Sequence, residues 1–416
     1  MWCCTSRIAM IEFSKRVEPI TYPIIDMLEL AREYSKKGKK IISLSFGDAV
    51  RASGFKPPKH VREALIEASK DEKNLYWAFY GDPQASPEFR EAVAFYEKRY
   101  HSNQVDPDNV FSFLGTSEGF MYLNAVLINP GDEALIPSAW YPAYPNYVYL
   151  FDGKPVAYEM IEEEGWRVDV DYMRKKITPR TRYIMVCTPS NPTGSILRER
   201  NLKEILDLAA EHELVVTFDE LYDQWVFEGQ HCCIGSIGKD VNIVGFGGLS
   251  KNWCLPGYRM GWCWIKGDER FVSRIKKELK KLTSTRLSAS TLMERVAIAA
   301  LRGPLDEVRE YVKEVSRRAE YCYKRINEID GLSSTKPEGG FHFLPKIERL
   351  GRFKDDQEFA LGLLKEKGVL VVPGSFFGPA GVSHFRETFL PPMEVLEEAH
   401  NLMEEFMRSL LSGGVY

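Results

Sequence analysis

The chain has 416 residues, of which 44% are hydrophobic and 27% are charged, so it is long enough for a large cored domain and a smaller second one. The formal net charge of −4 excludes the strongly basic surface that attracts nucleic acid. No apolar run approaches the roughly 20 residues of a membrane helix, and the N-terminal residues lack the apolar core of a signal peptide, so we expect a cytoplasmic protein.

Short apolar runs alternate with amphipathic helical patterns through the middle of the chain, which is typical of βαβ units and a mostly parallel sheet. In chain order the sequence predicts a helix at 118–127, strands at 133–136 and 183–187, a helix around 202–209, and strands at 214–218 and 242–246. Because helices separate these strands, we expect an α/β fold whose sheet is sandwiched by helices.

The last part of the chain changes character. Apolar residues at 395, 396, 399, 402, 403, 406 and 410 lie on one face of a predicted long helix. This change marks a second, smaller α+β domain. We place the large domain at 55–290 and the small C-terminal domain at 291–416, with residues 1–54 forming an N-terminal arm and part of the small domain.

Cysteines and histidines give no sign of a metal site. The eight cysteines include no Cys-x-x-Cys pair and no Cys/His set at zinc spacing, so we expect no metal. The seven histidines, such as His60, His212 and His400, fall in charged, helix-like surroundings. We expect them to be surface or satisfied residues and assign none of them a catalytic role.

Polar residues follow each predicted strand, at the edge of the sheet where ligands of open α/β folds bind. Asn191 follows 183–187, Asp219 and Tyr222 follow 214–218, and Lys251 follows 242–246. A run of small residues, Gly-Thr-Ser at 115–117, precedes the first helix. An amide, an acid with a phenol, an amine and an anion cradle are the groups that an aromatic aldehyde phosphate requires.

Each of these features also has an ordinary structural explanation. Asn-Pro-Thr-Gly at 191–194 is a common turn, an Asp at a strand end is often a helix cap, and Ser-Lys is often surface. The combination favours a binding site. The carboxylate of Asp219 follows the apolar run Leu-Val-Val-Thr-Phe, where desolvation is costly unless a cation such as a protonated pyridine nitrogen pairs with it.

Over essentially its whole length the chain resembles the fold-type I pyridoxal-phosphate-dependent aminotransferases, in particular the archaeal alanine, aspartate and tyrosine aminotransferase-like group. The matching motifs are YGDPQASPEFR (80–90), GTSEG (115–119), PGD (130–132), WYPAYP (140–145), NPTG (191–194), DELY (219–222), SK (250–251), PGYRMG (256–261), PG (373–374) and FRETF (385–389). Their order and spacing together carry the resemblance.

The resemblance implies a role for each residue that surrounds the cofactor ring. Lys251 would hold pyridoxal 5′-phosphate as a Schiff base and then act as the base that moves the substrate proton. Asp219 would keep the pyridine nitrogen protonated. Tyr222 and Asn191 would bind the ring oxygen, and Tyr141 would stack on the ring face.

The cofactor phosphate would be bound by several groups. The resemblance implies Gly115, Thr116 and Ser117 at a helix N-terminus, together with the guanidinium of Arg259. Tyr80 would reach the phosphate of the neighbouring subunit, which implies a homodimer with shared sites. Position 248 departs from the family, in which a serine often donates to the phosphate; here it is Gly248, and Ser250 or backbone groups are the candidates to replace it.

Substrate binding would fall to Arg386, whose fork matches an α-carboxylate, with help from Gly47 and Asn191. Arg286 is the candidate for the distal carboxylate of glutamate, contributed across the dimer, with a surface ion pair as the alternative. The expected reaction is ping-pong transfer of an amino group from an L-amino acid to a 2-oxo acid, of the alanine/glutamate type. A β-lyase, decarboxylase or cyclase on the same scaffold, and a DNA-binding regulator, are the alternatives.

Overall fold

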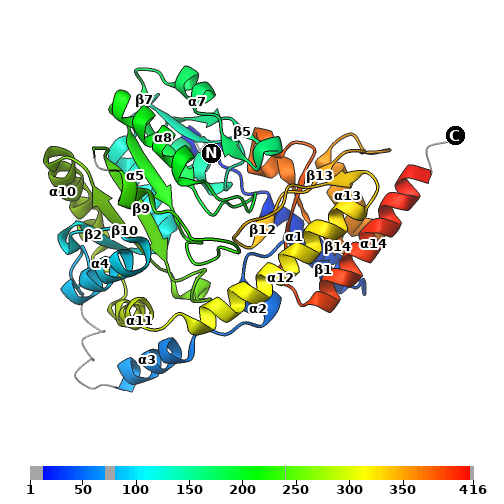
Figure 1. Cartoon of the computed structure of the whole chain (residues 1–416), viewed down its shortest axis with the longest axis horizontal. Helices are drawn as coiled ribbons and strands as arrows, with labels where there is room; N and C mark the ends of the chain where they lie inside the picture. The colour runs from blue at the N-terminus through cyan, green and yellow to red at the C-terminus, as the bar shows by residue number, and fades with distance from the viewer. Residues whose placement is uncertain (1–12, 71–79, 239, 413–416) are drawn as a thin grey trace, which may run out of the picture.

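A seven-stranded sheet forms the centre of the larger part of the molecule (Figure 1) in the computed structural model, which describes residues 13–70, 80–238 and 240–412. Its strands, in order across the sheet, are β2 (Val110–Leu114), β10 (Met260–Lys266), β9 (Ile243–Gly248), β8 (Val215–Asp219), β7 (Thr181–Cys187), β3 (Glu133–Pro137) and β4 (Lys154–Tyr158). The strand β10 is antiparallel to both neighbours, and the other pairs are parallel. The predicted mostly parallel sheet is confirmed.

Helices cover both faces of this sheet. They are α3 (Lys59–Lys70), α4 (Pro87–His101), α5 (Thr116–Leu127), α6 (Ala143–Tyr149), α7 (Val170–Lys176), α8 (Glu199–Glu211), α9 (Ile234–Ile237), α10 (Glu269–Arg286) and α11 (Thr291–Arg302). Successive side chains of a strand point to opposite faces, so Ile184 packs with α4, α8 and α11 whereas Tyr183 packs with α5, α6 and α10. This burial on both faces explains why the strands read as continuous apolar runs.

The second part of the molecule is built from the two ends of the chain. Its helices are α1 (Ile24–Lys36), α2 (Ala49–Ser53), α12 (Asp306–Glu328), α13 (Asp356–Lys367) and α14 (Met393–Ser412), and its strands are β1 (Ile42–Ser43), β11 (Leu332–Ser333), β12 (His342–Phe343), β13 (Lys346–Ile347), β14 (Val369–Leu370), β15 (Val372–Pro373) and β16 (Phe385–Thr388). The strands β1 and β14 pair in parallel, which fastens the N-terminal segment to the C-terminal one. The predicted α14 buries its apolar stripe in this second core.

Short elements complete the fold. A two-stranded ribbon is formed by β5 (Met160–Ile161) and β6 (Arg167–Val168). Short 3-10 helices lie at Lys15–Val17, Pro107–Asn109, Glu162–Glu164, Pro256–Tyr258, Gly374–Phe377 and Pro379–Gly381. No helix among the described residues has the length and apolar character needed to cross a membrane.

The helix α12 connects the two parts (Figure 1). Val308 near its start packs into the core of the larger part, whereas Val315, Ala319 and Cys322 pack into the core of the smaller one. The helix α11 precedes it and packs on α3 and α4. The domain limits at residues 54 and 290 stay a prediction.

Candidate active site

A cavity of about 200 Å³ lies beyond the carboxyl ends of β7, β8 and β9. Its lining residues are Thr116, Ser117, Phe120, Tyr141, Tyr144, Tyr147, Cys187, Asn191, Asp219, Leu221, Tyr222, Ser250, Lys251, Pro256 and Arg259. Nine of them are residues that the sequence analysis selected. A larger open groove of about 1340 Å³, bordered by charged residues of α7, α8 and α12, contains none of the selected residues.

Lys251 lies in the turn that follows β9, and its amine faces the cavity. Its Nζ donates a hydrogen bond to the carbonyl of Gly47 at 2.8 Å, which joins the turn after β9 to the N-terminal segment. Burial, reinforced by the charge of Arg386, lowers the pKa of Lys251 to about 8, although Asp48 and Asp219 oppose the shift. A larger fraction of the amine is therefore unprotonated, and nucleophilic, at neutral pH.

Asp219 is the last residue of β8 and is 8% exposed. It accepts hydrogen bonds from the hydroxyl of Tyr144 at 2.5 Å and from the backbone N–H of Leu221 at 3.1 Å. Burial raises the pKa of Asp219 to about 6 despite these donors. A carboxylate in this position has a strong preference for a cationic partner in the cavity.

Two tyrosines line the cavity beside these groups. The hydroxyl of Tyr222 is buried and has no hydrogen-bond partner among the described residues, and burial raises its pKa. Tyr141 lies at the cavity wall, edge-on to Tyr144 with ring centroids 5.6 Å apart, and its hydroxyl is 3.1 Å from that of Tyr22. Both rings border the space beside Lys251.

The opposite end of the cavity has the character of an anion site. The helix α5 begins at Thr116, so its free backbone N–H groups and its dipole point towards this end. The guanidinium of Arg259 packs against Gly115, where φ is +76° and any side chain would collide with it. Ser117 and Arg259 are both exposed, so this end is open to solvent.

Arg386, on β16, is only 4% exposed, and its hydrogen-bond partners among the described residues include no carboxylate. Its Nη1 donates to the side-chain oxygen of Asn191 at 3.0 Å, and its Nη2 donates to the carbonyl of Ser45 at 2.8 Å. Burial lowers its pKa to about 10, so it stays cationic at neutral pH. A buried guanidinium without an acid is suited to an incoming carboxylate.

Tyr80 and Arg286 do not line the cavity of their own chain. Tyr80 is 78% exposed. The guanidinium of Arg286, at the end of α10, lies 3.3 Å from Glu118 and donates to the carbonyls of Pro83 and Ser112.

His342 is a site residue that the sequence analysis missed. It is buried, and neither ring nitrogen has a hydrogen-bond partner among the described residues. The ring packs against Gly47, on the side where Lys251 also lies. Burial, together with the charges of Arg386 and Lys251, lowers the pKa of His342 well below its ordinary value, so the ring is neutral.

The expectation that the histidines are surface or satisfied residues is therefore wrong for His342, because the fold buries it beside Gly47 and Lys251, from a distant part of the chain, without a partner among the described residues. His400 does find a partner, the buried Glu387 at 3.0 Å. One feature of the sequence could have indicated His342: it is a polar residue between Phe341 and Phe343. In a strand its side chain points to the face opposite to that of the two phenylalanines. Tyr144 was also missed as the partner of Asp219.

These groups fit pyridoxal 5′-phosphate. The buried carboxylate of Asp219 suits a pyridinium nitrogen, the orphaned hydroxyl of Tyr222 suits a ring oxygen, and the α5 N-terminus with Arg259 suits a phosphate. The amine of Lys251 lies in the same cavity.

Comparison with known proteins gives one consistent family. The model of aminotransferase class I and II matches residues 39–402. The aspartate aminotransferase of Pyrococcus abyssi is 33% identical over 89% of this chain and 92% of its own, and the glutamate-pyruvate aminotransferase AlaA of Escherichia coli is 30% identical over 95% and 98%. The solved alanine aminotransferase from Pyrococcus furiosus is 43% identical and superposes with a TM-score of 0.92, covering 96% of this chain and 100% of its own.

Proposed function

The chain belongs to the class I and II aminotransferases, and on this premise we propose that alanine and glutamate, with their 2-oxo acids, are its substrates. It is a pyridoxal-phosphate-dependent enzyme that transfers an amino group from an amino acid to a 2-oxo acid. The observation that carries the proposal is the buried Arg386, which pairs with no carboxylate among the described residues and donates to Asn191 in the wall of the cavity that contains Lys251. The lyase, decarboxylase and cyclase alternatives gain no support from these relatives.

The bound cofactor supplies an electron sink for the charge that develops at the substrate Cα. The residues of the chain do the rest. Lys251 Nζ, with its lowered pKa, takes up the proton of Cα and returns it. The carboxylate of Asp219 holds the proton of the ring nitrogen, and the hydroxyl of Tyr222 donates to the ring oxygen.

Binding and orientation fall to a second set of residues. The N–H groups at Thr116 and Ser117 and the guanidinium of Arg259 bind the phosphate. A Cβ at position 248 would lie 3.2 Å from the carbonyl oxygen of Met260 and 3.5 Å from the Thr116 methyl, so a serine there would crowd the backbone of β10. Ser250 also lines this wall of the cavity.

Arg386 binds the substrate α-carboxylate through its fork, with Asn191 and Gly47 beside it. His342 is placed to contribute a further hydrogen bond to this substrate, because its two buried nitrogens have no partner in the part of the chain that the structure describes. The neutral ring offers one N–H donor and one acceptor. Binding of a polar substrate group would relieve the cost of leaving these nitrogens unpaired.

Replacing His342 by phenylalanine is expected to raise KM for the amino acid about tenfold while kcat changes less than about threefold. The melting temperature should stay constant or rise, because a buried imidazole with two unpartnered nitrogens is removed. Steady-state kinetics and calorimetry measure these quantities. His384→Phe is the matched control, since this buried ring has both nitrogens paired and lies outside the cavity; it should lower the melting temperature and leave KM alone. An unchanged KM in His342→Phe excludes substrate contact.

The amino-donor specificity is tested with a panel of amino acids and 2-oxoglutarate, for the wild type and for Arg286→Ala. Alanine and glutamate are the expected donors. If Arg286 binds a distal carboxylate across the dimer, kcat/KM for glutamate falls by roughly tenfold or more in the variant and that for alanine does not. Arg182→Ala, which breaks the ion pair with Asp132, is the control. If kcat/KM falls by the same few-fold factor for alanine and glutamate and the melting temperature falls as well, Arg286 stabilises the fold through its contact with Glu118 and does not bind the substrate.

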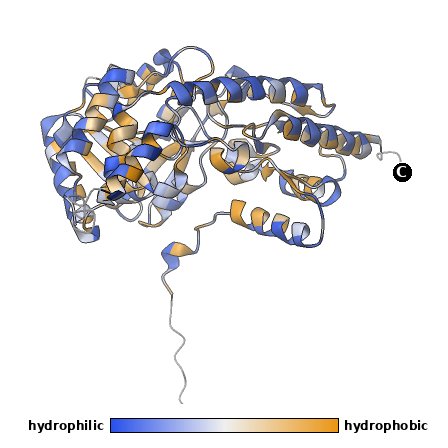
Figure 2. Ribbon diagram, turned by 90° about the horizontal axis from the view of Figure 1, so that it is seen from below, coloured by the Kyte–Doolittle hydropathy of each residue, from blue (hydrophilic) through white to orange (hydrophobic). Residues whose placement is uncertain are grey.

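A homodimer is part of the same proposal. Tyr80 is exposed and lies outside the cavity of its own chain, as expected for a residue that serves a neighbouring subunit. The arm at 13–23 runs below the body of the molecule in the view of Figure 2 and contacts it through the ion pair of Arg16 with Asp152, but Phe13 and Val17 on it are exposed. Exposed apolar residues on an extended arm favour contact with a second chain. Light scattering of the purified protein tests the dimer.

A further inference from the structure

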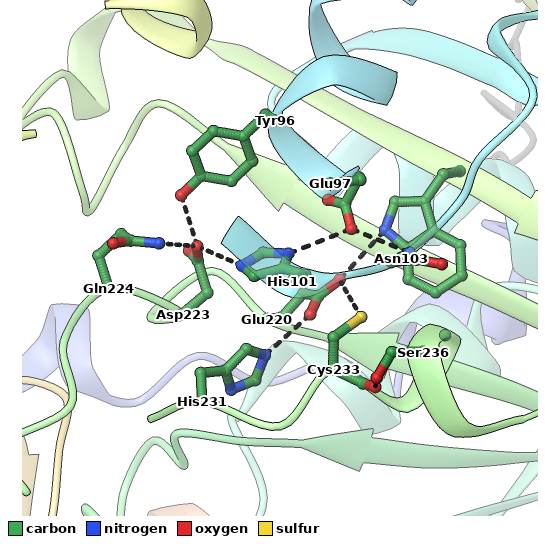
Figure 3. A network of polar contacts seen from close by, with 12 residues as sticks. Tyr96, Glu97, His101, Asn103, Glu220, Asp223, Gln224, His231, Cys233 and Ser236 are labelled. Carbon is green, nitrogen blue, oxygen red and sulfur yellow. Dashed lines mark hydrogen bonds and ion pairs between the residues drawn. The ribbon is translucent and has the colours of Figure 1, made fainter. Parts of the chain in front are cut away.

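A group of buried polar side chains joins α4 to the loops that follow β8 and β9 (Figure 3). We call it the support cluster. Its members are Tyr96, Glu97, His101, Asn103, Glu220, Asp223, Asn252, His231, Cys233 and Trp264. None of them lines the cavity.

Three members of the support cluster directly follow a cavity residue in the sequence. Glu220 follows Asp219, Asp223 follows Tyr222, and Asn252 follows Lys251. Asp219, Tyr222 and Lys251 line the cavity, whereas the residue after each of them is buried outside it. Each of these three cavity side chains is therefore followed directly by a side chain that anchors its loop in the cluster. The cluster is placed to determine how the three cavity side chains lie relative to one another.

Asp223 is the centre of the support cluster. Its Oδ2 accepts hydrogen bonds from the Tyr96 hydroxyl at 2.5 Å, His101 Nε2 at 2.9 Å and Gln224 at 2.8 Å. Its Oδ1 accepts a hydrogen bond from the amide of Asn252. Burial alone would raise the pKa of Asp223, but hydrogen bonding and the charge of His101 lower it to about 2. The carboxylate therefore remains charged and binds the Lys251 loop to the Tyr222 loop.

The support cluster is in turn fastened to the rest of the large domain. His101, the last residue of α4, also bonds Glu97 through Nδ1 at 3.1 Å, and Glu97 accepts from Asn103 at 2.9 Å. Although burial lowers the pKa of His101, the neighbouring carboxylates raise it well above its ordinary value, so the ring is a cation between two acids. Removing one partner of such a buried ion pair leaves an uncompensated buried charge, which strongly destabilises the folded protein.

Glu220 connects the loop after β8, which also contains Asp223, to the central sheet. It accepts hydrogen bonds from His231 Nε2 at 2.9 Å and from the indole N–H of Trp264, on β10, at 3.1 Å, and Cys233 Sγ lies 3.6 Å away. The loop after β8 is thus held at Glu220 by β10 and at Asp223 by α4. Such doubly held loops keep a fixed geometry because each bond is buried from water.

We infer that Asp223 and Asn252 are positioning residues, which fix the placement of the Lys251 amine relative to the Tyr222 hydroxyl through their buried hydrogen bond. The inference rests on the proposed roles of Lys251 and Tyr222. It does not require a metal, although Glu97, His101, Glu220 and Cys233 have ligand atoms within 4.8 Å of one another. Each of these four groups already has a hydrogen-bond partner in the support cluster.

The test is a spectrophotometric pH titration of the cofactor bound to the wild type, to Asn252→Ala and to Asp223→Asn. The pH at which the visible band changes reports the proton affinity at Lys251 and its surroundings. Asn252→Ala removes only the bridge between the loops and should change the ionisation constant read from the visible band by about threefold or more. Asp223→Asn should change this constant by about tenfold, which corresponds to one unit of pKa. The cofactor dissociation constant should rise in both variants.

Tyr158→Phe is the matched control. It removes a buried hydrogen bond, to the carbonyl of Met185 at 2.8 Å, in the same domain but away from both loops. It should lower the melting temperature and leave the titration unchanged. If Asn252→Ala titrates and binds cofactor like the wild type and only melts earlier, as the control does, the support cluster merely stabilises the fold and the inference is wrong.

Two other results would also overturn the inference that Asp223 and Asn252 are positioning residues. One equivalent of tightly bound metal in the purified holoenzyme, lost in Cys233→Ser, would make the cluster a metal site. A wild-type protein whose cofactor is not attached to Lys251 would remove the proposed function of that residue as well. The attachment is read independently by peptide mapping, so the two failures are distinguishable.

Discussion

Replacing Lys251 by alanine is expected to lower kcat by about 10,000-fold or more, because both the covalent hold on the cofactor and the base at the substrate Cα are lost. The fold should persist, since the amine makes a single hydrogen bond to the residues that the structure describes, to the carbonyl of Gly47. Turnover of alanine with 2-oxoglutarate gives the loss, and the melting temperature reports the fold.

Lys203→Ala is the control for this change. Lys203 is exposed on α8, where it pairs with Glu199, and its loss should leave kcat within about twofold, as is usual for exposed ion pairs. Borohydride reduction of the wild type followed by peptide mapping locates the attached cofactor. A label on another lysine, such as Lys266, would contradict the assignment to Lys251.

Asp219→Asn should keep the cofactor bound but slow removal of the Cα proton by about 1,000-fold or more, a loss comparable to that of other charged groups that act on the reacting atoms. The amide of asparagine cannot hold a proton on the ring nitrogen, so the ring accepts electrons poorly. Stopped-flow absorbance, or exchange of the Cα hydrogen with deuterated solvent, measures this step separately from product release.

Tyr144→Phe provides the comparison for Asp219. The substitution removes the hydrogen bond from the hydroxyl to the Asp219 carboxylate but retains the negative charge. We expect a loss of about tenfold at most, in line with one hydrogen bond to a charged group. Equal effects of the two substitutions, or a near-normal rate in Asp219→Asn, would show that Asp219 does not protonate the ring.

Much of the fold could be predicted because strands buried on both faces are apolar throughout. The runs at 133–136, 183–187, 214–218 and 242–246 appear as β3, β7, β8 and β9 with ends shifted by at most two residues. The strand β10 was not predicted as a strand. Its first residues belong to the motif Pro-Gly-Tyr-Arg-Met-Gly, and no local pattern shows that Met260–Lys266 pairs antiparallel with both β2 and β9.

The cavity residues were accessible to sequence reasoning because they follow strands directly. Asp219, Tyr222 and Lys251 lie at the carboxyl ends of neighbouring parallel strands, so they had to meet. His342 and the support cluster were not accessible. His101 follows Tyr-Glu-Lys-Arg-Tyr, which reads as a solvated helix face, yet it is buried against Asp223, more than a hundred residues away. Composition cannot show which charges find buried partners.

The cytoplasmic location and the domain limits stay predictions. They rest on patterns that neither the fold nor the relatives address. Amino transfer, by contrast, can be tested in the protein itself with a single experiment.

That experiment is the absorbance spectrum of the purified protein with bound cofactor while alanine and then 2-oxoglutarate are added. Amino transfer predicts that alanine abolishes the visible band and releases one equivalent of pyruvate, and that 2-oxoglutarate restores the band with formation of glutamate. Neither spectral change should occur in Lys251→Ala. A band that no amino acid changes, or one that changes with release of ammonia and does not return with any 2-oxo acid, would contradict transamination.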